Sequence, residues 1–288
     1  MSTITPFDIH DIIHIRGVDH PESIGVGPDG MAYTTGTGCQ VYRLDLEENL
    51  ACEFSSTEAR CLGTAVDADG NLYAAHTAGD VLKITPDGEV SVYATAPDGD
   101  EFLCTNYPAF DRQGRMYLSD SGDWSGELNG HIYRIGPGEG QARLWYPEPV
   151  DTPNAIALDS EEQHLYFVET FGSAIARIPI HEDGSAGTLE RVVHMPRHIP
   201  DGIAFDTEGR LWIACHRPDA IYVYDLASRR LELFAEDWMG EALRGPTDVA
   251  FAGPNRDILL AASLDNLVVH RFDNTGAVGL PLNHPRLP

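Results

Sequence analysis

The sequence predicts an all-β fold, a six-bladed β-propeller with four-stranded antiparallel blades, and three observations lead to it. An apolar, glycine-punctuated strand pattern returns six times along the 288 residues. Short strand-like stretches separated by turn signals such as Pro-Asp-Gly dominate each repeat, whereas helical signals are scarce. The repeats follow one another at intervals of 40 to 48 residues, which is typical of a four-stranded propeller blade.

Each repeat aligns on one apolar anchor residue in its strand pattern. The anchors are Val26, Val66, Phe110, Leu158, Phe205 and Phe251. Further strands are expected behind four of them, at 71–76, 80–86 and 91–95, at 115–120, 131–137 and 142–146, at 164–169, 174–180 and 189–194, and at 210–216, 220–226 and 230–236. A single blade cannot bury both faces of its sheet, but six blades around one axis can.

The six repeats account for nearly the whole chain, so residues 1–288 are expected to form one propeller domain. The run 11–17, Asp-Ile-Ile-His-Ile-Arg-Gly, is expected to add a strand to the last blade. Such closure removes the unpaired strand edges that an open ring would leave. The segment 121–130 is the longest candidate for a lid over the central channel.

The composition narrows the classes of partner and compartment. The net charge is −26, and nucleic acids and anionic membranes bind positive patches, so neither is an expected partner. Five cysteines without a Cys-x-x-Cys pair indicate reduced thiols and a cytoplasmic protein. The N-terminus has no signal-peptide pattern, and no stretch approaches the roughly 20 apolar residues of a membrane span. We expect a small-molecule substrate and a monomer or a simple homo-oligomer.

One position, four residues before each anchor and just ahead of the strand, carries oxygen-bearing side chains. In chain order it holds Glu22, Leu62, Asn106, Asn154, Asp201 and Thr247. Equivalent positions of the six blades converge on the axis, so the carboxylates and amides predict an oxygen-only metal site in the central channel. Hard oxygen ligands favour Ca²⁺, with Mn²⁺, Mg²⁺, Fe²⁺ or Zn²⁺ as alternatives.

A simpler interpretation is that each of these residues closes a turn by bonding nearby backbone. Four polar residues in one register with small or apolar neighbours favour a shared cation instead, because buried polar groups need partners. Asp248 lies one residue out of this register, and we interpret it as a turn or strand-cap residue.

The segments Pro21–Ser23, Thr105–Asp120, Thr152–Thr170 and Ile199–Ala214 resemble the regucalcin/gluconolactonase family of six-bladed propellers. Paraoxonases, diisopropylfluorophosphatase and strictosidine-synthase-like proteins belong to the same superfamily. The resemblance implies a metal held by Glu22, Asn154 and Asp201, with Asn106 as a further ligand or a substrate contact. Cys104 stands where some relatives carry a sugar-binding Arg, so a less polar lactone is as plausible as a sugar lactone.

These observations predict a metal-dependent lactonase, a gluconolactonase-like carboxylic ester hydrolase. The cation would polarise the lactone carbonyl, and Asp201 would activate the attacking water. Asn106 and Tyr107 are the expected substrate contacts. Alternatives are a phosphotriesterase or arylesterase activity at the same site, a non-catalytic binding propeller, and a metal-independent lyase or synthase.

Several further residues are weaker candidates for the site. Tyr107, Trp124 and Phe171 would form an apolar wall of the substrate pocket, with plain packing as the alternative. Residues that end the strand pattern behind an anchor are expected at the far end of the channel if that strand runs away from the site. These are His76, Asp120, Glu169 and His216, and turn residues or hydrogen-bonded histidines are the favoured interpretation.

Overall fold

The computed structural model describes residues 4–195 and 197–288, and in this part of the chain it is all-β. It has 24 strands and one 3₁₀ helix, η1 (Ile9–Asp11). No helix in the described part is long and apolar enough to cross a membrane.

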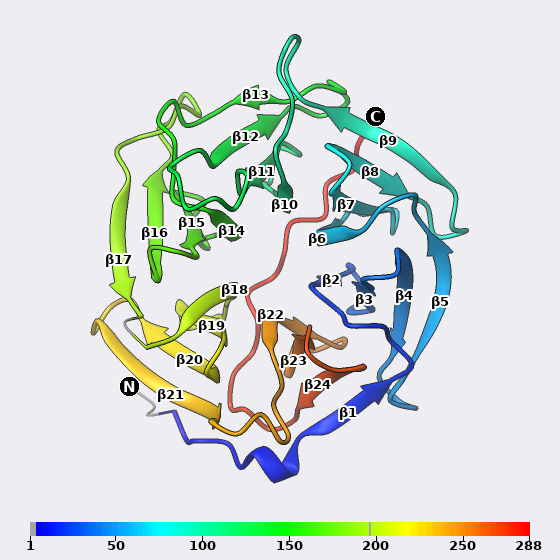
Figure 1. The fold of residues 1–288 in the computed structure, drawn as a ribbon, viewed down its shortest axis with the longest axis vertical. Helices are drawn as coiled ribbons and strands as arrows, with labels where there is room; N and C mark the ends of the chain where they lie inside the picture. The colour runs from blue at the N-terminus through cyan, green and yellow to red at the C-terminus, as the bar shows by residue number, and fades with distance from the viewer. Residues whose placement is uncertain (1–3, 196) are drawn as a thin grey trace.

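Figure 1 shows six groups of strands around a central axis, with the first strand of each group innermost. The groups are β2 (Ile24–Val26), β3 (Ala32–Thr35), β4 (Gln40–Asp45) and β5 (Leu50–Ser56); β6 (Cys61–Val66), β7 (Leu72–His76), β8 (Asp80–Ile84) and β9 (Val90–Thr95); β10 (Thr105–Phe110), β11 (Met116–Asp120), β12 (His131–Ile135) and β13 (Arg143–Leu144); β14 (Pro153–Leu158), β15 (His164–Glu169), β16 (Ala174–Pro179) and β17 (Glu190–His194); β18 (Ile199–Phe205), β19 (Arg210–His216), β20 (Asp219–Asp225) and β21 (Arg230–Asp237); and β22 (Pro246–Ala252), β23 (Ile258–Ser263), β24 (Val268–Phe272) and β1 (Ile13–Arg16).

Four of the groups are separate four-stranded antiparallel sheets, and the other two share one eight-stranded sheet. In that sheet β1 pairs antiparallel with β24, through partners such as Ile13 and Arg271. A single parallel pair, Arg16 with Leu50, joins β1 to β5. The predicted all-β class is confirmed, and the arrangement is compatible with a six-bladed propeller.

Burial within each group falls from the axis outward. The second strands β7 and β11 are buried along their whole length, whereas the outer strand β9 is mostly exposed. Anchor residues at the ends of the first strands pack against aromatic rings of the preceding group. The ring centroids of Phe110 and Tyr73 are 5.1 Å apart, and those of Phe205 and Tyr166 are 5.0 Å apart. Both pairs are edge to face. The repeated anchor of the sequence is therefore the contact that joins neighbouring sheets.

The residue before each anchor is small, because the sheets converge at the axis and leave little room there. It is Gly25, Ala65, Ala109, Ala157, Ala204 and Ala250 in the six groups. A cavity of about 390 Å³ remains on the axis, and residues of all six first strands line it.

The C-terminal segment closes the lower end of this cavity, where the anchors lie. The Leu280 N–H donates to the Phe205 carbonyl at 2.9 Å, and Asn283 Nδ2 donates to the Phe110 carbonyl at 2.9 Å. The His284 ring contacts the Val66 carbonyl at 2.9 Å. Anchor residues of three different sheets thus hold the segment by their backbone oxygens.

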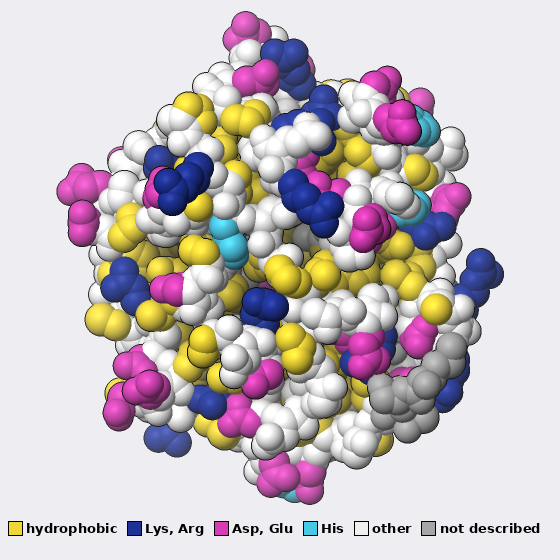
Figure 2. Space-filling model, turned by 180° about the vertical axis from the view of Figure 1, so that it is seen from behind, with side chains coloured by type: hydrophobic (Ala, Val, Ile, Leu, Met, Phe, Trp, Pro, Cys, Tyr) yellow, Lys and Arg dark blue, Asp and Glu magenta, His cyan; other side chains and the backbone are white. Residues whose placement is uncertain are grey.

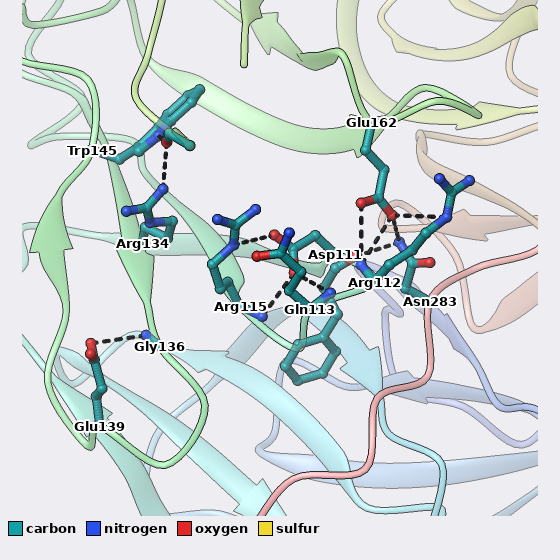
Figure 3. A network of polar contacts seen from close by, with 12 residues as sticks. Asp111, Arg112, Gln113, Arg115, Arg134, Gly136, Glu139, Trp145, Glu162 and Asn283 are labelled. Carbon is teal, nitrogen blue, oxygen red and sulfur yellow. Dashed lines mark hydrogen bonds and ion pairs between the residues drawn. The ribbon is translucent and has the colours of Figure 1, made fainter. Parts of the chain in front are cut away.

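Polar contacts fix the lower end further. In Figure 3 the backbone N–H of Arg112 and the side chain of Asn283 both reach the carboxylate of Glu162, at 3.0 and 2.7 Å.

Figure 2 shows one face of the molecule, on which acidic and basic side chains are interspersed among hydrophobic ones. On that face the large negative charge is spread out rather than gathered in one patch.

Candidate functional site

The residues four before the anchors lie at the upper end of the channel, opposite the C-terminal segment. The sequence placed them just ahead of the strand, but most of them lie within the first strand: Asn106 in β10, Asn154 in β14 and Asp201 in β18. Glu22 precedes β2 by two residues. In these three sheets the strand therefore begins a few residues earlier than the sequence suggested, whereas Glu22 precedes its strand as predicted.

The reason is a recurring irregularity in the first hairpin of the sheets. Pairing shifts register between Thr105 and Pro108, between Pro153 and Ile156 and between Pro200 and Ile203. The same shift occurs in β6 and in β22. A bulge leaves residues unpaired and re-aims their side chains, and bulges are common beside active sites. In β6, β10, β14 and β18 the unpaired residues are those three and four places before the anchor, whereas in β22 only Thr247, four places before its anchor, is unpaired.

Glu22 is mostly buried, and the guanidinium of Arg60 forms an ion pair with its carboxylate. Burial raises the pKa of Glu22, and the positive charges of Arg60 and His216 oppose that shift. Arg60 precedes β6, whose own register residue is the apolar Leu62. The second sheet therefore contributes a guanidinium cation to this group of residues, where other sheets contribute carboxylate or amide side chains.

Asp201 is close to the other charged groups of the site. Burial raises its pKa well above the ordinary range, and the negative charges of Glu22 and Asp248 raise it further. A hydrogen bond from Asn154 and the charge of Arg60 act in the opposite direction. Carboxylates crowded in this way repel one another, and a bound cation would relieve that repulsion.

Two buried hydroxyls orient the two amides. Asn106 donates through Nδ2 to Ser121 Oγ at 2.8 Å, and Asn154 donates through Nδ2 to Thr170 Oγ1 at 3.3 Å. Neither amide oxygen accepts a hydrogen bond from a residue in the described part of the chain. Both oxygens thus remain available as neutral ligands for a cation or for a substrate hydroxyl.

Asp248 and Tyr107 lie below this level and contact each other across the channel. Tyr107 donates its hydroxyl to Asp248 Oδ2 at 3.0 Å, and the Ile24 N–H donates to the same oxygen at 2.8 Å. Burial raises the pKa of Asp248 to about 7. The bond to Ile24 N–H is the strand-capping role that the sequence suggested. Tyr107 also lines the axial cavity, so its ring lies between that cavity and the site.

The weaker candidates lie at the upper end, because the second strand of each sheet runs antiparallel to the first. His76 contacts Asp80 at 2.6 Å and the Ala59 N–H at 3.1 Å, so both ring nitrogens have partners. Asp120 accepts backbone N–H groups of the preceding loop, and Glu169 pairs with Arg191 at 2.6 Å. These contacts agree with structural roles. The expectation of a far-end position fails because the strand returns toward the site.

Sequence reasoning missed three residues of the site, Arg60, Ser121 and Thr170. Ser121 and Thr170 each directly follow the second strand of their sheet, at 1% and 6% exposure. A hydroxyl at that place in two successive repeats was a readable signal. Arg60 has no counterpart in the other repeats, so the repeat pattern did not point to it.

The donor set fits a divalent cation only if the amides take part. Among the residues that the structure describes, no three His, Cys, Asp or Glu side chains come together in a way that could hold a metal ion. Glu22 and Asp201 supply two carboxylates, and Asn106 and Asn154 supply neutral oxygens that accept no hydrogen bond. Oxygen donors of this mixed kind suit Ca²⁺ or Mg²⁺.

Comparisons with known proteins place these features in a wider context. The family model described as "SMP-30/Gluconolactonase/LRE-like region" matches residues 25–265. A protein named Lactonase drp35 from Staphylococcus saprophyticus is 22% identical over 241 residues, which cover 80% of this chain and 74% of that protein. Pentonolactonase XacC from Haloferax volcanii is 27% identical over 200 residues, covering 68% of this chain and 65% of the relative.

Solved structures share the fold at low sequence identity. A gluconolactonase from Xanthomonas campestris superposes with a TM-score of 0.77 at 17% identity, over 90% of this chain and 88% of its own. A calcium-binding regucalcin from Agrobacterium tumefaciens superposes with a TM-score of 0.79 at 17% identity, over the full length of both chains.

Proposed function

The chain belongs to the SMP-30/gluconolactonase/LRE-like family, and on this premise we propose that it is a metal-dependent lactonase. Relatives named as lactonases support ring-opening hydrolysis of a cyclic ester. We also propose that the whole chain forms one six-bladed propeller domain, with the active site at the upper end of its channel.

We propose that Glu22, Asn154, Asp201 and Asn106 hold one divalent cation, with Ca²⁺ as the first candidate. The observation that carries this proposal is the pair of amides whose Nδ2 atoms are bound to hydroxyls while both oxygens remain without a donor. The structurally similar regucalcin from Agrobacterium tumefaciens, which is described as calcium-binding, supports the choice of ion. When bound, the cation would polarise the lactone carbonyl and stabilise the charge that develops on its oxygen.

The protein's own groups supply the remaining chemistry. Asp201 takes a proton from the attacking water and returns it to the ring oxygen that leaves as the ester opens. Asn106 either binds the cation or donates a hydrogen bond to the substrate, and Tyr107 forms the floor beneath the lactone. Burial of these groups excludes bulk water and strengthens each electrostatic contact.

The second candidate function is a phosphotriesterase or arylesterase at the same site, because an activated water and an electrophile-binding cation serve those esters as well. A binding propeller without chemistry is the other alternative. Against it stands the buried, mutually repelling pair Glu22 and Asp201, which costs stability unless a ligand compensates it.

The test is hydrolysis by protein stripped of metal with a chelator, after Ca²⁺, Mg²⁺, Mn²⁺, Fe²⁺ or Zn²⁺ is restored separately. Acid release from a panel of lactones in a pH-stat is expected only with a restored ion. Glu22→Gln is expected to weaken ion binding about tenfold in calorimetry, since one carboxylate ligand becomes neutral. Full turnover in the metal-free protein would refute metal dependence, and turnover of paraoxon or phenyl acetate alone would favour the second candidate.

A further inference from the structure

Two large exposed aromatic side chains follow closely in the chain after the hydroxyl residues that orient the two amides. Trp124 is 42% exposed and Phe171 is 50% exposed. Trp124 lies in the loop between β11 and β12, three residues beyond Ser121, and Phe171 directly follows Thr170. Each ring therefore extends from the short segment whose hydroxyl orients one of the site amides.

The two rings contact each other across the boundary between neighbouring sheets. Their centroids are 5.8 Å apart and their planes are at 86°, an edge-to-face arrangement. The Trp124 side chain interacts with the Cys104 thiol, whose pKa also responds to the charges of Arg60 and Glu22. The aromatic pair thus borders the site on the side of Asn106 and Asn154.

The loop that carries Trp124 is internally braced. The Asp123 carboxylate accepts the Ser125 N–H at 3.0 Å, and Asn129 Oδ1 accepts the Asp123 N–H at 3.3 Å. Gly122 has a φ of +76°, and Asn129 Oδ1 lies 2.0 Å from the place of an added Cβ, so only glycine fits there. Trp124 itself has a φ of +57°, which is uncommon for a bulky residue. Strain of this kind is concentrated at functional sites.

These features do not suit a polyhydroxylated ring. Each hydroxyl brought against the faces of the two aromatic rings would lose water without gaining a hydrogen-bond partner, because those faces carry no polar group. Burial keeps the pKa of the Cys104 thiol above its ordinary value, so this group adds no charge. An apolar ring, in contrast, would bury area that now faces water.

We propose that Trp124 and Phe171 form the specificity wall of the site and select lactones that carry an aromatic or other apolar substituent. This inference rests on the proposed lactonase function and narrows its substrate class. The lactone ring lies at the amides, and its substituent lies against the two aromatic side chains.

The test compares γ-phenyl-γ-butyrolactone with γ-butyrolactone, which lacks only the phenyl group, and with glucono-δ-lactone. We expect kcat/KM to be at least about tenfold higher for the phenyl compound. Trp124→Ala or Phe171→Ala should remove most of that preference, lowering kcat/KM far more for the phenyl compound than for γ-butyrolactone. Trp238→Ala is the matched control, since Trp238 is 68% exposed and lies in the loop after β21.

A binding measurement separates this inference from the lactonase function. The lactams 5-phenyl-2-pyrrolidinone and 2-pyrrolidinone have the same shapes as the two butyrolactones but resist hydrolysis. Tighter calorimetric binding of the phenyl lactam, lost in Trp124→Ala, would support the wall even if no lactone were hydrolysed. Equal binding of both lactams, a preference for glucono-δ-lactone, or an equal loss with both butyrolactones in Trp124→Ala would overturn it, even with lactonase activity present.

Discussion

The two ends of the channel use the same side-chain chemistry in opposite ways. At the lower end, the residue after the anchor is an aspartate in four of the six repeats, and Asp67 shows how its acceptors are filled. Asp67 accepts the backbone N–H groups of Asp69 and Asn71, the side chain of Asn71 and the hydroxyl of Tyr73. At the upper end, Glu22 has one guanidinium partner, and Asp201 has the Asn154 side chain as a partner while the negative charges of Glu22 and Asp248 lie nearby.

The difference teaches how to separate structural from functional carboxylates in a repeat. A buried carboxylate with several donors stabilises the turn that supplies them, and it needs nothing from outside. A buried carboxylate with few hydrogen-bond donors lowers the stability of the fold. It is retained where a bound ligand supplies the missing partner. The supply of hydrogen-bond donors therefore distinguishes the carboxylates at the two ends of the channel.

Replacing Asp201 tests the upper end most severely. Asp201→Ala should lower kcat by at least about a thousandfold, because a metal ligand and the proposed proton acceptor are lost together. The melting temperature should stay the same or rise, because repulsion with Glu22 and Asp248 is removed. Steady-state kinetics and thermal unfolding of the same samples measure both effects. Normal turnover in this variant would refute the role of Asp201.

Replacing Asp67 should give the opposite result at the lower end. Asp67→Ala should reduce the free energy of unfolding by about 2–4 kcal/mol, since the buried Tyr73 hydroxyl and two backbone N–H groups lose their acceptor. kcat of the folded protein should change less than about twofold, because the turn lies at the opposite end of the channel from the site. Urea unfolding gives the first value, and Asp67→Asn serves as the milder matched variant. A large loss of kcat with unchanged stability would abolish the distinction between the two ends.

A smaller effect is expected at the C-terminal segment, through His284. Burial lowers the pKa of His284 in the folded protein. The unfolded chain therefore takes up a proton first as the pH falls through about 6.5, so stability present above that pH is lost below it. Between about pH 7.5 and 5.5 the free energy of unfolding should fall less in His284→Asn than in the unchanged protein. The difference between the two falls should be less than about 1 kcal/mol. Urea unfolding at several pH values measures the slope, and an unchanged slope would exclude His284 as its source.

The sequence predicted the repeat and its register because both depend on local patterns. Anchors such as Phe110 and Phe205 recur at a fixed spacing since each joins two neighbouring sheets, and the residues four places earlier follow at the same interval. Their exact placement was missed because a bulge is a property of strand pairing, which leaves no mark in one strand's own sequence.

Contacts between different repeats were the part that could not be predicted. The ion pair of Arg60 with Glu22 joins two sheets, and the contact of Tyr107 with Asp248 crosses the channel. Both depend on the three-dimensional arrangement of the sheets. The orienting roles of Ser121 and Thr170 were accessible in principle, since both residues follow equivalent strands.

The pairing of β1 with β24 has a consequence for synthesis on the ribosome. β1 finds its antiparallel partner only after Val268–Phe272, the last strand of the described residues, has been synthesised. Until then β1 lacks its antiparallel partner, and unpaired strand edges invite association with other chains. Stalled or shortened nascent chains should therefore depend on chaperones far more than the finished protein does.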